Sequence, residues 1–341
     1  SIDKPHSRFQ CLNLWAHPKA RSALTAKSDS SYKSSVTTSV DYLCSVIRGQ
    51  KRGLGPTLLR WGLRLASAPY SLVTGARNFC FDRGWKKSHK VDVPVVSVGN
   101  LTVGGTGKTP CVEYIARFYR EEGIRVAILS RGYGAEQGTN DEALMLEEML
   151  PDVPHLQDAD RVALAAVAIE ELESELLILD DGFQHRRLKR DLDLVLLDCT
   201  DPWGQGYQLP RGFLRESPRG LRRAHAVILT RCDQASNRES IKARIARLAP
   251  NVPIVETCHR ATGLINSEGE TSPLEDLKST SVAGFCGIGN PEAFRRSLID
   301  RGVNLIDFRT YADHHRYTRE DVDELRRWAK SLPEQTRMLT T

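Results

Sequence analysis

The residues with the clearest chemical potential lie at 97–110, which read SVGNLTVGGTGKTP. An apolar, β-rich run leads into a glycine-rich turn, and a lysine and a hydroxyl residue then open a predicted helix. Backbone N–H groups of such a turn, with the helix N-terminus behind them, form a concave site for phosphate oxygens. The segment therefore predicts a nucleoside triphosphate site formed by Thr102, Val103, Gly104, Gly105, Thr106, Gly107, Lys108 and Thr109.

Two residues of this predicted P-loop have specific expected roles. Lys108 would reach the β- and γ-phosphates of ATP, and the Thr109 hydroxyl would ligate Mg²⁺. Pro110 is compatible with the first helical turn, because the N–H that it lacks would be unpaired there. The strict P-loop pattern has a glycine at the position of Thr102, so the sequence departs from the pattern at this residue.

A pair of acidic residues follows a second apolar run. Asp180 and Asp181 come directly after the run at 176–179. In P-loop proteins the aspartate that organises Mg²⁺ follows a buried strand in this way. We expect the pair to hold the metal, with either aspartate able to do so, and a helix cap or turn is the structural alternative.

A third group of candidate residues lies at 209–216, which read LPRGFLRE. Arg215 is suited to bind the transferring phosphate through two parallel hydrogen bonds, and Glu216 is suited to complete the metal shell. Taken alone, an adjacent arginine and glutamate are by default interpreted as a surface ion pair.

The elements that must position these residues are strands alternating with helices. Uniformly apolar runs predict strands at 91–98, 124–130, 175–180, 192–198 and 225–230, and helices are predicted at 110–122 and 158–173. This alternation is typical of a parallel sheet covered on both faces. The predicted fold class is α/β: a P-loop NTPase-like parallel sheet with helices on both faces, a second smaller α/β domain, and an N-terminal amphipathic membrane-interface helix.

The chain divides into regions of different composition. We expect a poorly ordered, Ser/Thr-rich extension at 1–40, whose composition also fits an organelle transit peptide. A basic amphipathic membrane-association segment at 41–90 and a P-loop kinase domain at 91–260 follow. Residues 261–278 are predicted to be a linker or hairpin, and residues 279–341 a second α/β domain.

The segment at 57–81 has the pattern of an interfacial helix. Leu58, Trp61, Leu65, Ala68 and Leu72 recur at helical spacing, and arginine and serine residues fall on the opposite side. Pro69 is expected to kink or split this helix. Ten basic residues and one acidic residue lie between positions 42 and 90. We therefore predict contact with an anionic membrane surface, the alternative being a stripe packed on the chain's own core.

Composition excludes several other classes of protein. The 341 residues are 40% hydrophobic and 27% charged, which is typical of a folded globular chain. The eight cysteines form no C-x-x-C pair, which argues against a zinc ribbon or a disulfide scaffold and fits reduced cytosolic thiols. The sequence contains no uncharged apolar run of about 18 residues, so a membrane-spanning helix is not expected.

Taken together, these segments resemble the tetraacyldisaccharide 4′-kinase family of lipid A biosynthesis. The matching pieces occur in the family's order from about residue 41 to the end, and they are PVVSVGNLTVGGTGKTP, AILSRGYG, NDEALML, LILDDGFQH, QLPRGFLRES, GFCGIGNPEAF and DHHRYT. The resemblance implies transfer of the γ-phosphate of ATP to the 4′-hydroxyl of a tetraacylated glucosamine disaccharide 1-phosphate, forming lipid IVA. It also implies a peripheral location at the cytoplasmic face of the bacterial inner membrane.

The resemblance further implies a catalytic base. The family pairs an aspartate of a G-D-E motif with a histidine of the second domain. The matching residues here are Asp141, which Asn140 precedes in place of glycine, and His314 or His315, of which we favour His314. With Lys108 and Arg215, these residues complete the predicted catalytic set. Two departures from the family are a short stretch between Lys108 and Asp141 and a second domain that continues further in family members.

Three other functions are compatible with parts of the pattern. A membrane-surface ATPase switch of the MinD or ArsA type would carry a signature lysine where this chain has Val103. A nucleotide-binding adaptor without turnover would not need Asp141 or the acidic pair. Nucleic-acid binding would account for the basic segment, but that segment has few aromatic residues on which bases could stack. We predict a lipid disaccharide substrate, no nucleic-acid partner and a monomer.

Overall fold

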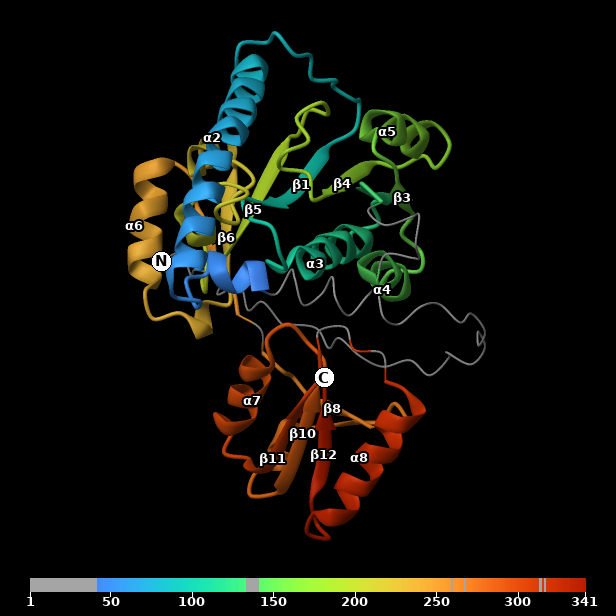
Figure 1. The fold of residues 1–341 in the computed structure, drawn as a ribbon. Coiled ribbons are helices and arrows are strands. Elements are labelled where there is room, and N and C mark those ends of the chain that lie inside the picture. The colour runs from blue at the N-terminus through green and yellow to red at the C-terminus, as the bar shows by residue number, and fades with distance from the viewer. Residues whose placement is uncertain (1–41, 133–140, 259, 267, 313–314, 316) are drawn as a thin grey trace, which may run out of the picture. The chain divides into compact units, whose positions relative to one another are not determined.

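The computed structural model describes residues 42–132, 141–258, 260–266, 268–312, 315 and 317–341, except for the side chains of 141–143. The chain forms two compact units that divide between residues 258 and 259 (Figure 1). The larger unit contains the P-loop, and the smaller unit contains the C-terminal strands and helices.

The larger unit is built on a seven-stranded sheet in the order β3-β2-β4-β1-β5-β6-β7, and every pairing is parallel. The strands are β1 (Val95–Asn100), β2 (Val126–Ser130), β3 (His155–Gln157), β4 (Leu176–Asp180), β5 (Leu192–Asp198), β6 (Ala226–Thr230) and β7 (Ile254–Glu256). The helices are α2 (Leu54–Asp82), α3 (Lys108–Glu121), α4 (Asp141–Met149), α5 (Arg161–Glu170) and α6 (Arg238–Leu248). Short 3₁₀ turns are η1 (Gly204–Gly206), η2 (Pro218–Arg223) and η3 (Cys232–Gln234).

Helices cover both faces of this sheet because alternate residues of each buried strand point to opposite sides. On one face of β4, Leu176 and Ile178 pack with Val112 of α3 and Leu146 of α4. Leu177 and Leu179 pack instead with Ala165 of α5. The predicted α/β class with a doubly covered parallel sheet is confirmed, and the predicted strands match the observed ones within a few residues.

Helix α2 is not split at Pro69, although a split is one of the two outcomes that the sequence predicts. The helix continues through this proline as one element of 29 residues. Proline at 69 removes the hydrogen bond to the carbonyl of Leu65, and both residues lie on the exposed side of the helix. The expected break is therefore absent, because the carbonyl that loses its partner faces outward. No helix among the described residues combines the length and apolar character needed to cross a bilayer.

The smaller unit has a three-stranded parallel sheet in the order β11-β10-β12. Its strands are β10 (Ser281–Cys286), β11 (Asn304–Thr310) and β12 (Arg337–Thr340), with helices α7 (Pro291–Ile299) and α8 (Arg319–Ser331). Residues 261–278 contain the antiparallel pair β8 (Leu264–Ile265) and β9 (Thr271–Ser272) and the turn η4 (Leu274–Leu277). Leu277, Val282, Leu298 and Val303 form the core of this unit.

Candidate active site

The P-loop connects β1 to α3 and is held in shape by its own polar groups. Gly107 has φ 84°, a left-handed conformation that favours glycine, and α3 begins at the next residue. The Asn100 amide donates to the Thr106 hydroxyl at 2.9 Å, and the Thr230 hydroxyl at the end of β6 donates to the Thr106 carbonyl at 3.0 Å. These contacts fix the turn before any ligand arrives, so the loop is preformed for phosphate.

The acidic pair lies beside this loop because β4 is the direct neighbour of β1. Asp180 is the register partner of Val98, and the N–H of Gly182 donates to the Val98 carbonyl at 3.0 Å. A Cβ at Gly182 would lie 2.6 Å from the Ser97 hydroxyl oxygen, so only glycine allows this close approach. Burial and the neighbouring Asp180 carboxylate raise the pKa of the Cys111 thiol in α3 to about 12. Asp180 is therefore near enough to Cys111, in the first turn of α3, for its charge to act on that thiol, and Thr109 lies in the same turn.

Asp181 joins the two cationic residues that the sequence singled out. Its carboxylate lies 3.8 Å from the Lys108 ammonium and 2.6 Å from the Arg215 guanidinium. Burial opposes ionisation of Asp181, but the charges of Lys108 and Arg215 outweigh it, so the pKa of this carboxyl is lowered. Two cations and a carboxylate thus meet at the mouth of the P-loop.

Arg215 reaches this position because its loop pairs with the P-loop backbone. The N–H of Val103 donates to the Phe213 carbonyl at 2.8 Å, and the N–H of Arg215 donates to the Leu101 carbonyl at 2.7 Å. A short antiparallel bridge joins Thr102 to Leu214. Arg215 is therefore part of the phosphate-binding edge of the sheet and not a solvent-exposed loop residue.

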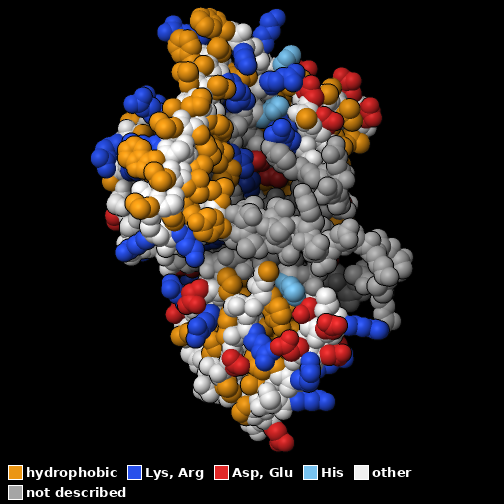
Figure 2. Space-filling view, in the orientation of Figure 1, with side chains coloured by type: hydrophobic (Ala, Val, Ile, Leu, Met, Phe, Trp, Pro, Cys, Tyr) orange, Lys and Arg blue, Asp and Glu red, His pale blue; other side chains and the backbone are white. Residues whose placement is uncertain are grey.

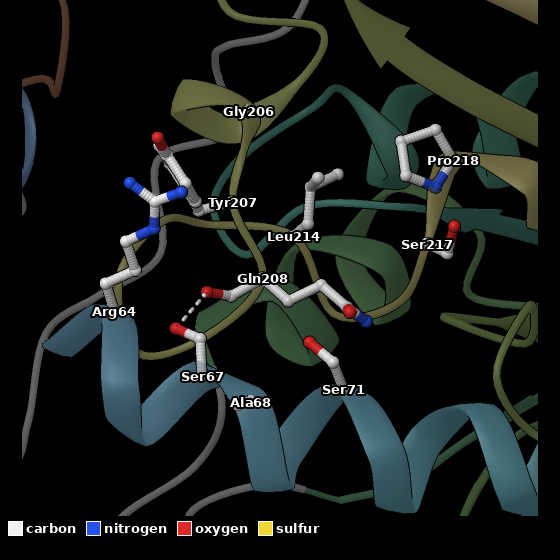
Figure 3. Close-up of a pocket in the computed structure, with 10 residues that line it drawn as sticks. All are labelled: Arg64, Ser67, Ala68, Ser71, Gly206, Tyr207, Gln208, Leu214, Ser217 and Pro218. Carbon is white, nitrogen blue, oxygen red and sulfur yellow. Dashed lines mark hydrogen bonds between the residues drawn. The ribbon is translucent and has the colours of Figure 1, made fainter.

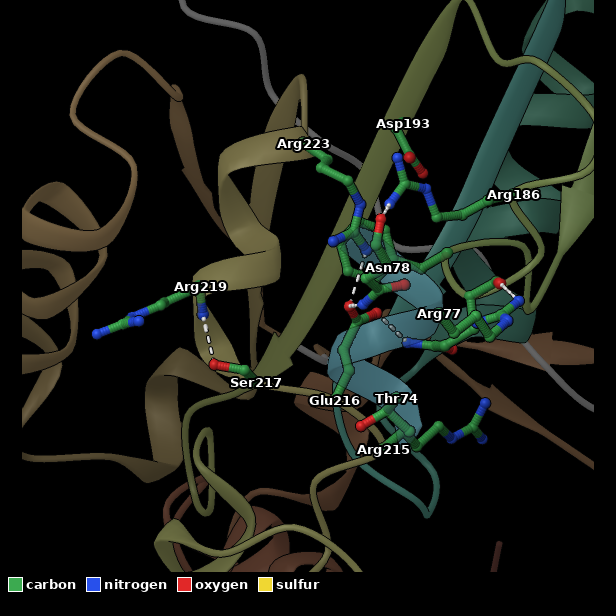
Figure 4. Close-up of polar contacts among 12 residues, drawn as sticks. Thr74, Arg77, Asn78, Arg186, Asp193, Arg215, Glu216, Ser217, Arg219 and Arg223 are labelled. Carbon is green, nitrogen blue, oxygen red and sulfur yellow. Dashed lines mark hydrogen bonds and ion pairs between the residues drawn. The ribbon is translucent and has the colours of Figure 1, made fainter. Parts of the chain in front are cut away.

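Glu216 has a different setting from that of the acidic pair. It is buried, and both of its carboxylate oxygens accept hydrogen bonds from side chains (Figure 4). The donors are Asn78 of α2 at 2.8 Å, Gln184 at 2.9 Å and Arg223 at 2.9 Å. The role of Glu216 as a metal ligand stays a prediction. In this arrangement its carboxylate accepts hydrogen bonds from three other side chains.

The remaining oxygen donors fit Mg²⁺. Asp180, Asp181 and the Thr109 hydroxyl carry hard oxygen atoms at one edge of the sheet, and these would be the ligands of a bound Mg²⁺. No group of three or more His, Cys, Asp or Glu side chains that could hold a metal is found in the part of the chain described. A site of two carboxylates and one hydroxyl, completed by phosphate oxygens and water, is the type that Mg²⁺ uses.

Sequence reasoning missed a buried arginine at this edge, Arg161, and gave no role to the nearby His185. Arg161, the first residue of α5, is only 4% exposed and donates to the Asp180 carbonyl at 3.4 Å. An arginine at a helix N-terminus gives no sequence signal of burial. Nearby, burial and the charges of Arg161 and Arg187 lower the pKa of His185 to about 4, so this imidazole is neutral at pH 7.

The predicted catalytic base lies largely outside the described residues. Asp141 is the first residue of α4, but its side chain is not described, and His314 also falls outside the described residues. His315 is described within the smaller unit. Its Nε2 lies 3.1 Å from the Asp321 carboxylate, and its ring stacks on Tyr311 with centroids 4.9 Å apart. These contacts tie His315 to the N-terminus of α8.

A preformed P-loop, an acidic pair on the adjacent parallel strand and an arginine at the same edge define a P-loop nucleotide-binding phosphotransferase. The family model for tetraacyldisaccharide-1-P 4′-kinase matches residues 59–341. The chain belongs to this kinase family, as its motifs predict.

Relatives and a solved structure agree with this assignment. The tetraacyldisaccharide 4′-kinase of Anaeromyxobacter dehalogenans (strain 2CP-C) is 40% identical over 287 residues, covering 78% of this chain and 76% of the relative. That of Syntrophus aciditrophicus is 39% identical over 297 residues, covering 79% of each chain. The crystal structure of the "apo" form of LpxK from Aquifex aeolicus in complex with ATP matches with a TM-score of 0.62 and 33% identity, covering 83% of this chain and 88% of that chain.

Proposed function

We propose that this kinase transfers the γ-phosphate of ATP to the 4′-hydroxyl of a tetraacylated glucosamine disaccharide 1-phosphate. The observation that carries the proposal is the meeting of Lys108, Asp181 and Arg215 at the mouth of the P-loop. Membership of the tetraacyldisaccharide-1-P 4′-kinase family supports this acceptor. The relative from Aquifex aeolicus, whose structure contains ATP, supports ATP as the phosphate donor.

In the proposed reaction Lys108 and Arg215 neutralise the moving phosphoryl group, because phosphoryl transfer depends mainly on positioning and charge stabilisation. When nucleotide enters, its phosphate oxygens replace Asp181 as the partners of both cations. Asp180, Asp181 and Thr109 would hold Mg²⁺, which supplies further charge neutralisation at the phosphates. Glu216 contributes indirectly, through Gln184 and Asn78.

Asp141 is proposed as the base for the acceptor. The 4′-oxygen forms a bond to the γ-phosphorus, the bond from that phosphorus to the β–γ bridging oxygen breaks, and the hydroxyl proton passes to Asp141. We favour His314 over His315 as the partner of Asp141. The contacts of His315 with Asp321 and Tyr311 support this choice, since they give His315 a structural role.

Helix α2 is proposed to bind the membrane that holds the acceptor lipid. Leu54, Leu58, Trp61, Leu65 and Leu72 are all strongly exposed, and Figure 2 shows an apolar band over α2 with basic side chains around it. An exposed apolar stripe of this size marks a binding surface and argues against packing on the chain's own core. We further propose the cytoplasmic face of the inner membrane, a monomeric enzyme and no nucleic-acid partner.

Membership of the kinase family disfavours the MinD/ArsA-type ATPase switch, and Val103 at the signature lysine position agrees. Product chemistry separates the two functions. The enzyme, ATP and a tetraacyl disaccharide 1-phosphate in detergent micelles should yield a bisphosphorylated lipid by mass spectrometry and ³¹P NMR, with the new ester at the 4′-oxygen. A matched acceptor with a 4′-deoxy position should give none. ATP hydrolysis without any phosphorylated lipid would refute the proposal.

A further inference from the structure

Helix α2 has a second face, which is polar and turned toward the rest of the larger unit. Its residues recur at helical spacing, so they share one side of the helix. They are Ser67, Tyr70, Thr74, Arg77 and Asn78, and each hydrogen-bonds outside the helix. An amphipathic helix on a globular domain normally turns its apolar side inward. In α2 the apolar side is exposed, and the opposite side contacts the domain through these hydrogen bonds.

The partners of this polar face belong to the segment that carries Arg215. The Ser67 hydroxyl donates to the Gln208 carbonyl at 3.0 Å (Figure 3). The same hydroxyl accepts from the Arg211 N–H at 3.1 Å. The Gln208 amide donates to the Thr74 hydroxyl at 3.3 Å. Successive turns of α2 therefore contact the loop from Gln208 to Glu216 along its length.

At Arg215 the backbone is held from both sides. Its N–H donates to the Leu101 carbonyl at the start of the P-loop at 2.7 Å, and its carbonyl accepts from the Tyr70 hydroxyl at 2.9 Å. Burial raises the pKa of Tyr70, so the phenol keeps its proton and donates at neutral pH. The side chain of Arg215 is then free to extend to Asp181, 2.6 Å away.

The next residue is fixed in the same way. Asn78 donates to Glu216 at 2.8 Å, and Glu216 also accepts from Gln184, which follows the acidic pair. Arg77 donates to the Gln184 carbonyl at 2.6 Å (Figure 4). Glu216 thus links α2 to the loop after β4, and the Arg215 backbone lies between two helix-anchored points.

We propose that Tyr70 and Asn78 are positioning residues for phosphoryl transfer, which hold Arg215 at the P-loop from the membrane-facing helix. This inference rests on the proposed role of Arg215. Loss of either contact lets the arginine leave its place without changing the P-loop itself. Turnover then falls while ATP binding is kept, because the nucleotide is held mainly by the loop and Lys108.

The test measures kcat, the KM for ATP and melting temperature in detergent micelles, where attachment to a bilayer is not limiting. Tyr70→Phe removes one hydroxyl, and kcat should fall about fivefold to tenfold, the usual worth of one hydrogen bond. The KM for ATP should change less than twofold. Tyr119→Phe, which removes a hydroxyl from the last turn of α3, is the matched control and should leave both constants unchanged.

Three further variants separate positioning from simple loss of stability. Asn78→Asp has nearly the same shape as asparagine but places a negative charge against Glu216, so its kcat should fall below that of Asn78→Ala. In an Arg215→Lys background, the planar guanidinium that Tyr70 would position is already lost. Tyr70→Phe should therefore cause no further fall in kcat in that background. Additive losses in the double variant would overturn the inference.

The Arg215→Lys variant alone tests the role of Arg215, apart from the roles of Tyr70 and Asn78. If Arg215→Lys keeps wild-type kcat, the proposed role of Arg215 fails. If Arg215→Lys is impaired while Tyr70→Phe and Asn78→Asp both keep wild-type kcat, the role of Arg215 stands and the positioning inference fails. A fall in melting temperature with unchanged kcat would likewise assign Tyr70 and Asn78 a structural role only.

Discussion

Replacing three exposed leucines of α2 with glutamine should detach the protein from membranes without unfolding it. Leu58, Leu65 and Leu72 are 69%, 73% and 73% exposed, so none contributes a buried contact to the larger unit. Glutamine has a similar length and a good helix propensity, so the helix itself should persist. The melting temperature of Leu58→Gln/Leu65→Gln/Leu72→Gln should lie within about 2 °C of wild type.

The size of the binding effect follows from the exposed area. Complete transfer of a leucine side chain out of water stabilises by about 2 kcal/mol. Transfer of the exposed part, about 70% of such a side chain, into the bilayer would therefore contribute about 1.4 kcal/mol to membrane binding. The three leucines together would contribute about 4 kcal/mol to the free energy of membrane binding if their exposed surfaces enter the bilayer fully. They would contribute about 2 kcal/mol if only the outer half of each exposed surface enters. The partition constant should therefore fall by roughly 30-fold to 700-fold.

Sedimentation with sucrose-loaded vesicles that contain anionic phospholipid measures this constant directly. Leu172→Gln, which changes a leucine that is 38% exposed and lies beyond the end of α5, is the matched control and should sediment like wild type. Equal sedimentation of the triple variant and wild type would refute the assignment of α2 as the membrane-binding helix.

Three other predictions concern the site. Asp181→Asn should lower kcat by about 10²-fold to 10³-fold in a transfer assay, because it removes a proposed metal ligand and the anion that Lys108 and Arg215 share; wild-type turnover would exclude the role. The lowered pKa of Asp181 implies stability that is present above the unfolded value near 4 and is lost as pH falls through the folded value. The melting temperatures of wild type and Asp181→Asn should therefore converge below about pH 4, and a constant difference would contradict this. His185, with a folded pKa of about 4, should cost about 1–2 kcal/mol of stability as pH falls from about 6.5 to 4, after allowance for solvent screening; His185→Gln should flatten the decline in denaturant titrations, and an unchanged slope would exclude His185 as its source.

The P-loop and the acidic pair could be predicted from sequence because their chemistry is local. Gly107, Lys108 and Thr109 are consecutive, and Asp180 and Asp181 follow their strand directly. Parallel pairing of β1 with β4 then brings the two groups together, as expected for strands that end at the same edge of a sheet. Short-range pattern and sheet topology suffice for this part of the site.

The role of α2 could not be predicted in full. The pattern identified the apolar stripe, but Ser67 on the other side gave no indication that it would be buried against Gln208. The contact of Tyr70 with Arg215 joins residues 145 positions apart, and no local spacing encodes it. Glu216 was predicted to complete the metal shell, and its hydrogen bonds from Asn78 and Gln184, which lie 138 and 32 positions away, could not be predicted from local spacing.

This P-loop site is proposed to transfer phosphate to the lipid acceptor. The most direct measurement is transfer of ³²P from γ-labelled ATP to a tetraacyl disaccharide 1-phosphate in detergent micelles, with wild type, Lys108→Ala and Asp141→Ala compared at equal concentrations. We predict a labelled lipid with wild type, none with Lys108→Ala, and a strong loss with Asp141→Ala, which still binds ATP. Labelled inorganic phosphate without labelled lipid, or unchanged transfer by Lys108→Ala, would contradict the account.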